Sequence, residues 1–169
     1  MRATSLIAMG MLAIAGCGSS VDQQSAVKVM STALTGTGQA QAKLMPASGS
    51  STASYNGTVT NPAGSGSATV SGTATQNGSA WSFVFDITYN HWTDAASNVT
   101  IDGALHETAN FSSLNPLLGS FSLTGMLTAS GAVQAHVDFN LSAVYSTTSI
   151  KITGNVGGNS IDETVATGG

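Results

Sequence analysis

The chain is poor in charged residues. Its 169 residues include 4 Lys and Arg against 8 Asp and Glu, and the net charge is −4. Arg2 is the only arginine, and the cations that follow it are Lys28, Lys43 and Lys151. Proteins that bind nucleic acids neutralise phosphates with clusters of Lys and Arg. We therefore expect no nucleic-acid partner, and an acidic chain also has no electrostatic attraction to anionic lipid head groups.

Cysteine and long apolar runs are almost missing as well. Cys17 is the only cysteine, so no disulfide can form within the chain. The apolar run from Leu6 to Ala15 is too short for a transmembrane helix, which needs about 20 residues. No other apolar run in the sequence comes near that length. A lone thiol in an exported protein is a reactive liability unless it is chemically capped.

Motifs of catalysis and metal binding are missing too. No Gly-x-Ser-x-Gly elbow joins a strand to a helix, and no phosphate-binding loop ends in Gly-Lys-Ser or Gly-Lys-Thr. The histidines are His91, at the end of a strand on its apolar face, and His106 and His136, on the polar faces of strands with another strand between them. Asp102 and Asp138 lie near them in sequence, but a metal needs three or four converging ligands. We expect no catalytic, metal or cofactor site and therefore no enzyme.

The N-terminal part of the mature chain predicts one short helix. Asp22 is a suitable N-cap for a helix through Leu34, and Gly36 is a typical residue to end it. Residues 35–54 are rich in Gly, Ser, Thr and Ala, which is typical of a linker. Within them, Gln39 to Met45 alternates weakly and would fit an edge strand.

From Tyr55 onward apolar and polar residues alternate, which predicts antiparallel strands. Asn77-Gly78 is the strongest turn signal, and a two-residue hairpin there fixes a register. That register pairs Gln76 with Ser79, Ala74 with Trp81, Gly72 with Phe83 and Val70 with Phe85. Glu107 is an exception to the pattern, because its parity points it inward, opposite Phe83. It would lie either at a barrel mouth or as a buried acid.

The pattern as a whole predicts an all-β fold with one short N-terminal helix. We expect seven or eight strands in an up-and-down antiparallel meander that closes into a small barrel or a strongly curled sheet. A two-sheet β-sandwich is the alternative. A membrane-spanning barrel fits less well, because the outward positions carry Ser, Thr, Asp, His and Asn. The expected divisions are a removed segment 1–16, an N-terminal segment 17–54 and a β domain 55–169.

The first residues have the layout of a secretory signal, with a positive charge at Arg2, a short apolar run and small residues before Cys17. Ile14-Ala15-Gly16-Cys17 resembles the lipobox of bacterial lipoproteins. The resemblance covers about the first seventeen residues, and the rest of the chain resembles no family. It implies cleavage before Cys17 and a diacylglycerol thioether on the Cys17 sulfur, with acyl chains such as palmitate. Gly18 resembles the signal for sorting to the outer membrane.

These observations lead to two expectations about function. The first is a lipid-anchored protein of the bacterial cell envelope that acts as a non-enzymatic structural or interaction module, facing the periplasm or the surface. Its partners would be the membrane, through the lipid on Cys17, and an envelope protein. The alternative is a binding protein that holds a small apolar ligand inside a β-barrel, which rests on analogy of fold alone.

Overall fold

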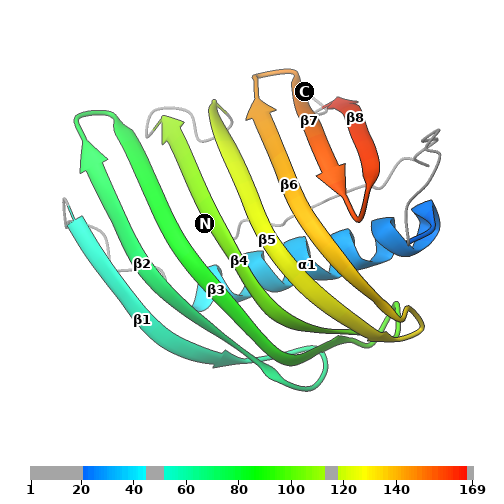
Figure 1. The fold of residues 1–169 in the computed structure, drawn as a ribbon. Helices are drawn as coiled ribbons and strands as arrows, with labels where there is room; N and C mark the ends of the chain where they lie inside the picture. Colours follow the sequence, from blue (N-terminus) through cyan, green and yellow to red (C-terminus); the bar gives the residue numbers. More distant parts are fainter. Residues whose placement is uncertain (1–20, 45–51, 113–117, 167–169) are drawn as a thin grey trace.

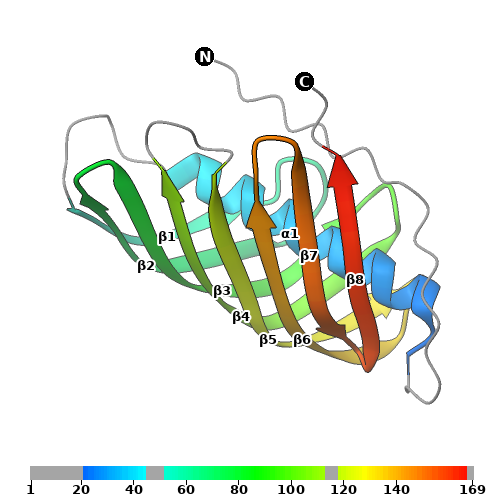
Figure 2. The ribbon, with the colours of Figure 1, turned by 90° about the horizontal axis from the view of Figure 1, so that it is seen from above.

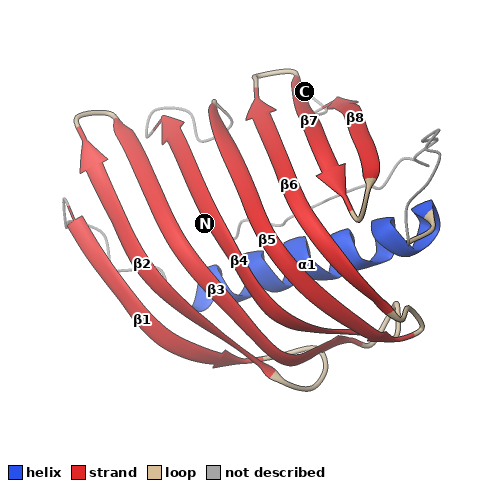
Figure 3. Ribbon diagram, viewed as in Figure 1, coloured by secondary structure: helices blue, strands red, loops and turns tan. Residues whose placement is uncertain are grey.

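A computed structural model describes residues 21–44, 52–112 and 118–166 of the chain. These residues form one helix and eight strands (Figures 1 and 3). The helix is α1 (Gln23–Leu44). The strands are β1 (Thr52–Thr60), β2 (Ser67–Asn77), β3 (Ala80–Asp94), β4 (Val99–Ser112), β5 (Gly119–Gly131), β6 (Ala135–Tyr145), β7 (Ser149–Val156) and β8 (Asn159–Ala166).

The eight strands form a single antiparallel sheet in which each strand pairs with the next along the chain. The predicted meander is therefore confirmed, and the two-sheet sandwich is wrong. The closed barrel is also wrong, because β1 and β8 lie at opposite edges of the sheet and do not pair. The helix gives a physical reason. α1 crosses the strands on the side toward which they bend (Figures 1 and 2), and its buried residues occupy the space that a barrel would enclose.

The helix begins as predicted but extends further. The Asp22 carboxylate accepts a hydrogen bond from the backbone N–H of Ser25 at 3.0 Å, which is N-capping geometry. The helix continues through Gly36 to Leu44, so the predicted end at Gly36 is wrong. The linker expected from residue 35 and the edge strand expected from Gln39 are also wrong as far as Leu44, where the described helix ends. A Cβ at Gly36 would lie 3.0 Å from both Trp92 Nε1 and Tyr89 Cε1. This glycine therefore lets the helix approach the sheet closely and does not end it.

The β2–β3 hairpin keeps the predicted faces but not the predicted partners. Asn77 pairs with Ala80, which leaves Gly78 and Ser79 as the two turn residues. Gly78 has φ +60°, the conformation that a II′ turn needs at its first central residue. Ala74 therefore lies opposite Phe83 and not Trp81, Gly72 opposite Phe85, and Val70 opposite Ile87. A shift of two residues leaves every side chain on its predicted face.

Irregularity in β3 brings an extra aromatic side chain into the core. The register with β4 shifts between Tyr89 and Trp92, and His91 has φ +51°. Trp92 is buried as a result, although the sequence pattern places it at the start of a loop. The Tyr89 hydroxyl donates a hydrogen bond to the Ala33 carbonyl at 2.9 Å and lies 2.6 Å from the hydroxyl of Thr37. Tyr89 and Trp92 thus hold the C-terminal half of α1 against the sheet.

Candidate functional site

The lipidation site predicted at Cys17 lies outside the described residues. The first described residue is Val21, whose carbonyl accepts a hydrogen bond from Asn159 Nδ2 at 3.2 Å. Val21 is buried and lies against Gly157, in the turn between β7 and β8. The chain therefore enters the fold beside this turn.

The three histidines lie apart on exposed surface. Nδ1 of His106 is 2.8 Å from Asp86 across the β3–β4 pair, and His136 contacts Thr128 at 3.1 Å. His91 does not face the core as predicted, because the irregularity in β3 turns it outward. Its backbone N–H donates to Asp102 at 2.8 Å. In the described part of the chain, no three His, Cys, Asp or Glu side chains are grouped so that they could hold a metal ion.

Glu107 is a buried acid, the second of its two predicted positions. It is 4% exposed and lies opposite Phe85 and Leu123, not opposite Phe83 as the predicted register has it. Burial, with a smaller contribution from the negative charge of Glu107, raises the pKa of Tyr145 above its ordinary value. The same two effects raise the pKa of Tyr89, where the hydrogen bond from Thr37 opposes them. Tyr89 and Tyr145 therefore both lie within electrostatic range of the Glu107 carboxyl.

A group of half-buried aromatic residues, which we call the aromatic face, lies between Glu107 and the strand ends that carry the β2–β3 and β6–β7 turns. It consists of Trp81, Phe83, Phe111, Phe121 and Tyr145. Ring centroids are 6.1 Å apart for Trp81 and Phe83, and 5.4 Å apart for Phe111 and Tyr145. The contacts of α1 with Tyr89, Trp92 and Ser97 lie toward the opposite strand ends. The aromatic face is thus an apolar part of the concave side that keeps some solvent exposure.

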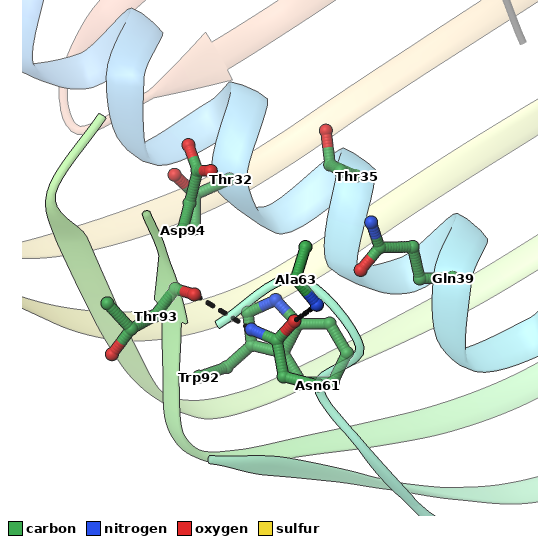
Figure 4. Close-up of a pocket in the computed structure, with 8 residues that line it drawn as sticks. All are labelled: Thr32, Thr35, Gln39, Asn61, Ala63, Trp92, Thr93 and Asp94. Carbon is green, nitrogen blue, oxygen red and sulfur yellow. Dashed lines mark hydrogen bonds between the residues drawn. The ribbon is translucent and has the colours of Figure 1, made fainter. Parts of the chain in front are cut away.

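A shallow hollow lies where α1 meets the C-terminal ends of β1 and β3 (Figure 4). Thr32, Thr35, Gln39, Asn61, Ala63, Trp92, Thr93 and Asp94 surround it. Its volume of about 20 Å³ suits one water molecule. The Asn61 side chain donates to the Thr93 carbonyl at 2.8 Å and accepts from the Ala63 backbone N–H at 3.0 Å. These bonds fasten the loop after β1 to the end of β3, which is a structural role.

The sequence predicted most members of the aromatic face as inward residues but not as a surface. Alternation in β3 and β5 indicates that Trp81, Phe83 and Phe121 share one face with the core. The alternation does not indicate where the helix lies on the sheet. The position of the helix is what decides which of the inward residues are covered. The aromatic face is therefore a property of how α1 crosses the sheet.

The only helix in the described residues is not long and apolar enough to cross a membrane. Comparison with known proteins found no protein-family model, no curated protein and no solved structure that matches this chain.

Proposed function

We propose that this protein is a lipid-anchored protein of the bacterial cell envelope, held by a lipid on Cys17, that acts as a non-enzymatic structural or interaction module. The observation that carries the proposal is the sequence Ile14-Ala15-Gly16-Cys17 behind a short apolar run. A lipid on Cys17 would be attached at most about 14 Å from Val21, because four residue-to-residue steps join the two residues and each spans at most about 3.6 Å.

The fold supports a role in interaction rather than chemistry. The described polar side chains of the sheet are spread over its exposed face as separate pairs, such as Asp86 with His106. The inward side is largely apolar and packs against α1, and the aromatic face is a part of it that stays half-buried. Val21 lies by the β7–β8 turn, whereas the aromatic face lies toward the other ends of the strands. The described chain therefore begins, at Val21, at the end of the molecule away from the aromatic face.

Localisation after expression in a bacterium tests the anchor. We expect the wild-type chain to take up radioactive palmitate, to lose residues 1–16 and to sediment with the outer membrane. Cys17→Ser should abolish labelling and leave the chain soluble or uncleaved, whereas Ser19→Ala, a matched change two residues away, should leave both unchanged. Labelling of Cys17→Ser at the wild-type level would refute the proposal.

A second candidate function is binding of a small apolar molecule, with the aromatic face as the contact surface in place of a barrel interior. The half-buried state of its five aromatic residues favours this candidate. Trp81 lies on this face, and Trp92 is buried below α1, so Trp81→Phe separates the two fluorescence signals. Saturable quenching by a micromolar fatty acid that Trp81→Phe removes would favour this function over the first. We expect no such saturation, because the described hollow is far smaller than a ligand pocket.

A further inference from the structure

β1 is an outer strand of the sheet, and none of the described strands pairs with its free side. Its register with β2 is unbroken over nine residues. Just after β1, the backbone N–H of Asn61 donates to the Gly66 carbonyl at 3.0 Å. Backbone polar groups alternate in direction along an antiparallel strand. The N–H and C=O groups of Ser54, Asn56, Thr58 and Thr60 therefore point away from β2, toward the free edge.

The chemistry of this edge does nothing to prevent pairing. Natural sheets protect their edges with charged residues, proline, bulges or short strands. β1 has neither charge nor proline, and it pairs with β2 without a bulge. At the other edge, β8 carries Asp162 and Glu163, so two β8 strands side by side would bring acidic residues together. The two edges of the sheet thus differ, and β1 is the one suited to another strand.

A second copy of β1 fits this edge in one register in particular. The sheet repeatedly places an aromatic ring opposite a glycine: Tyr55 and Phe85 flank Gly72, Tyr89 lies opposite Gly103, and Phe139 lies opposite Gly125. Such pairs cover the bare backbone of a glycine and help to fix register. Antiparallel pairing of two β1 strands centred on Asn56 places Tyr55 of each copy opposite Gly57 of the other. It also places Ser54 opposite Thr58, both exposed.

We propose that two copies of this chain pair through the free edges of their β1 strands, antiparallel, about a twofold axis between the two Asn56 residues. The two sheets become one continuous sheet whose concave sides lie on the same side. The interface closes after two copies because the same surface is used twice. The pairing uses only described residues and does not depend on the lipid anchor.

Disulfide formation tests the central pair directly. Asn56 would form a hydrogen-bonded pair with its twofold mate, with Cα atoms about 5.5 Å apart, inside the range that a disulfide spans. We expect the full-length Asn56→Cys chain to form a disulfide dimer under mild oxidation. The wild-type chain, Ser160→Cys on β8 and Asn140→Cys in the middle of the exposed face should give little. A mixed disulfide between Asn56→Cys and Ser160→Cys chains would instead show head-to-tail pairing and overturn the proposal.

Charge reversal at the facing pair tests the register. In the Ser54→Lys/Thr58→Lys chain, lysines of the two copies face each other twice. In the Ser54→Lys/Thr58→Glu chain, each lysine faces a glutamate. Both variants remove the 2.9 Å contact between the Thr58 and Thr69 hydroxyls. The loss of this contact therefore cannot account for a difference between the two variants. We expect dimerisation of the first to be roughly ten-fold weaker than that of the second, measured by light scattering in detergent.

A backbone change gives an independent check. Asn56→Pro removes an N–H that faces the free edge and leaves the ladder to β2 intact, so it should abolish the dimer without lowering the urea midpoint of the monomer. Equal dimerisation of the two lysine variants, a dimer that survives Asn56→Pro, or a wild-type chain that is monomeric in detergent would each overturn the proposal.

Discussion

The hydrogen bonds of the Tyr89 hydroxyl should contribute measurably to stability, because they join α1 to the sheet. Tyr89 is 2% exposed and Thr37 is 4% exposed, so neither hydroxyl has bulk water as a substitute partner. Tyr89→Phe removes the bond to the Ala33 carbonyl and the contact with Thr37. A neutral hydrogen bond contributes about 0.5–1.5 kcal/mol. The hydroxyl of Thr37 can turn to the carbonyl four residues before it, that of Ala33, and recover part of the loss. We expect a net cost of about 1–2 kcal/mol.

A double-mutant cycle separates this link from the general cost of each change. Thr37→Val alone leaves the bond from Tyr89 to Ala33 and should cost about 0.5–1 kcal/mol. The double variant should cost less than the sum of the two by about 0.5–1 kcal/mol. With a urea m-value of about 2 kcal/mol/M, a cost of about 1–2 kcal/mol from Tyr89→Phe lowers the unfolding midpoint by about 0.5–1 M. An unchanged midpoint, or costs that add, would refute the link between helix and sheet.

Alkaline pH gives a second measure of the same group. Burial raises the pKa of Tyr89 above its ordinary value of 10.0. The unfolded chain therefore loses this proton at a lower pH than the folded chain. The contribution of the buried Tyr89 phenol to the free energy of unfolding is complete below pH 10 and is lost as the pH rises above 10. Tyr89→Phe lacks this loss, so its stability deficit should shrink above pH 10 in urea titrations, and a constant deficit would contradict the burial of the phenol.

Three further changes test other parts of the fold by urea or thermal unfolding. Phe85→Ala should cost about 3–5 kcal/mol, because it leaves a cavity between Gly72 and Glu107, and a cost below 1 kcal/mol would contradict its burial. Gly78→Val should cost about 1–3 kcal/mol from positive φ alone, since an added Cβ meets no atom within 4 Å; Ser79→Val, its matched control, should cost less. Hydrogen bonds from Ser97, opposed by some burial, lower the pKa of Asp94. The Asp94→Asn chain should therefore be less stable than the wild type at pH 7 and lose this difference as pH falls below 3.8, whereas a difference that persists at pH 2 would refute the reasoning.

Local patterns in the sequence predicted the strands well but could not predict their closure. Alternation identifies the inward residues of each strand, and every consecutive pair is joined by a short connection that favours antiparallel neighbours. Whether the sheet closes depends on what lies inside its curve. α1 fills that space, and nothing in the strand pattern shows how close a helix can come. The contact that brings α1 close to the sheet is that between Gly36 and Trp92, which lie 56 positions apart in the sequence. Taken locally, Gly36 predicts the end of a helix and Trp92 the start of a loop, so neither residue indicates the contact.

Register and site were predictable to different degrees for similar reasons. Period-two alternation cannot tell a register from one shifted by two, so the faces of the β2–β3 hairpin were correct while its partners were wrong. In the structure Gly72 lies opposite Phe85, and a Cβ added to Gly72 would come 2.9 Å from the Phe85 ring. The hydrophobic pattern of the sequence does not indicate this contact. Glu107 was predictable as inward because parity is local. The lipidation of Cys17 remains a prediction, since that residue lies outside the described part of the chain.

The position of α1 has a consequence for the order of folding. Strand contacts in this meander join neighbours in sequence, so the sheet can grow hairpin by hairpin at a small cost in loop entropy. The helix is different: it is synthesised before all eight strands, yet Asn159 contacts Val21, just before the helix, across 138 positions of sequence. The N-terminal end of α1 therefore cannot reach its final place until β7 and β8 have formed. Until then the apolar side of the sheet near β7 and β8 lacks the cover of this end of the helix, so an end of α1 made before the strands docks after them.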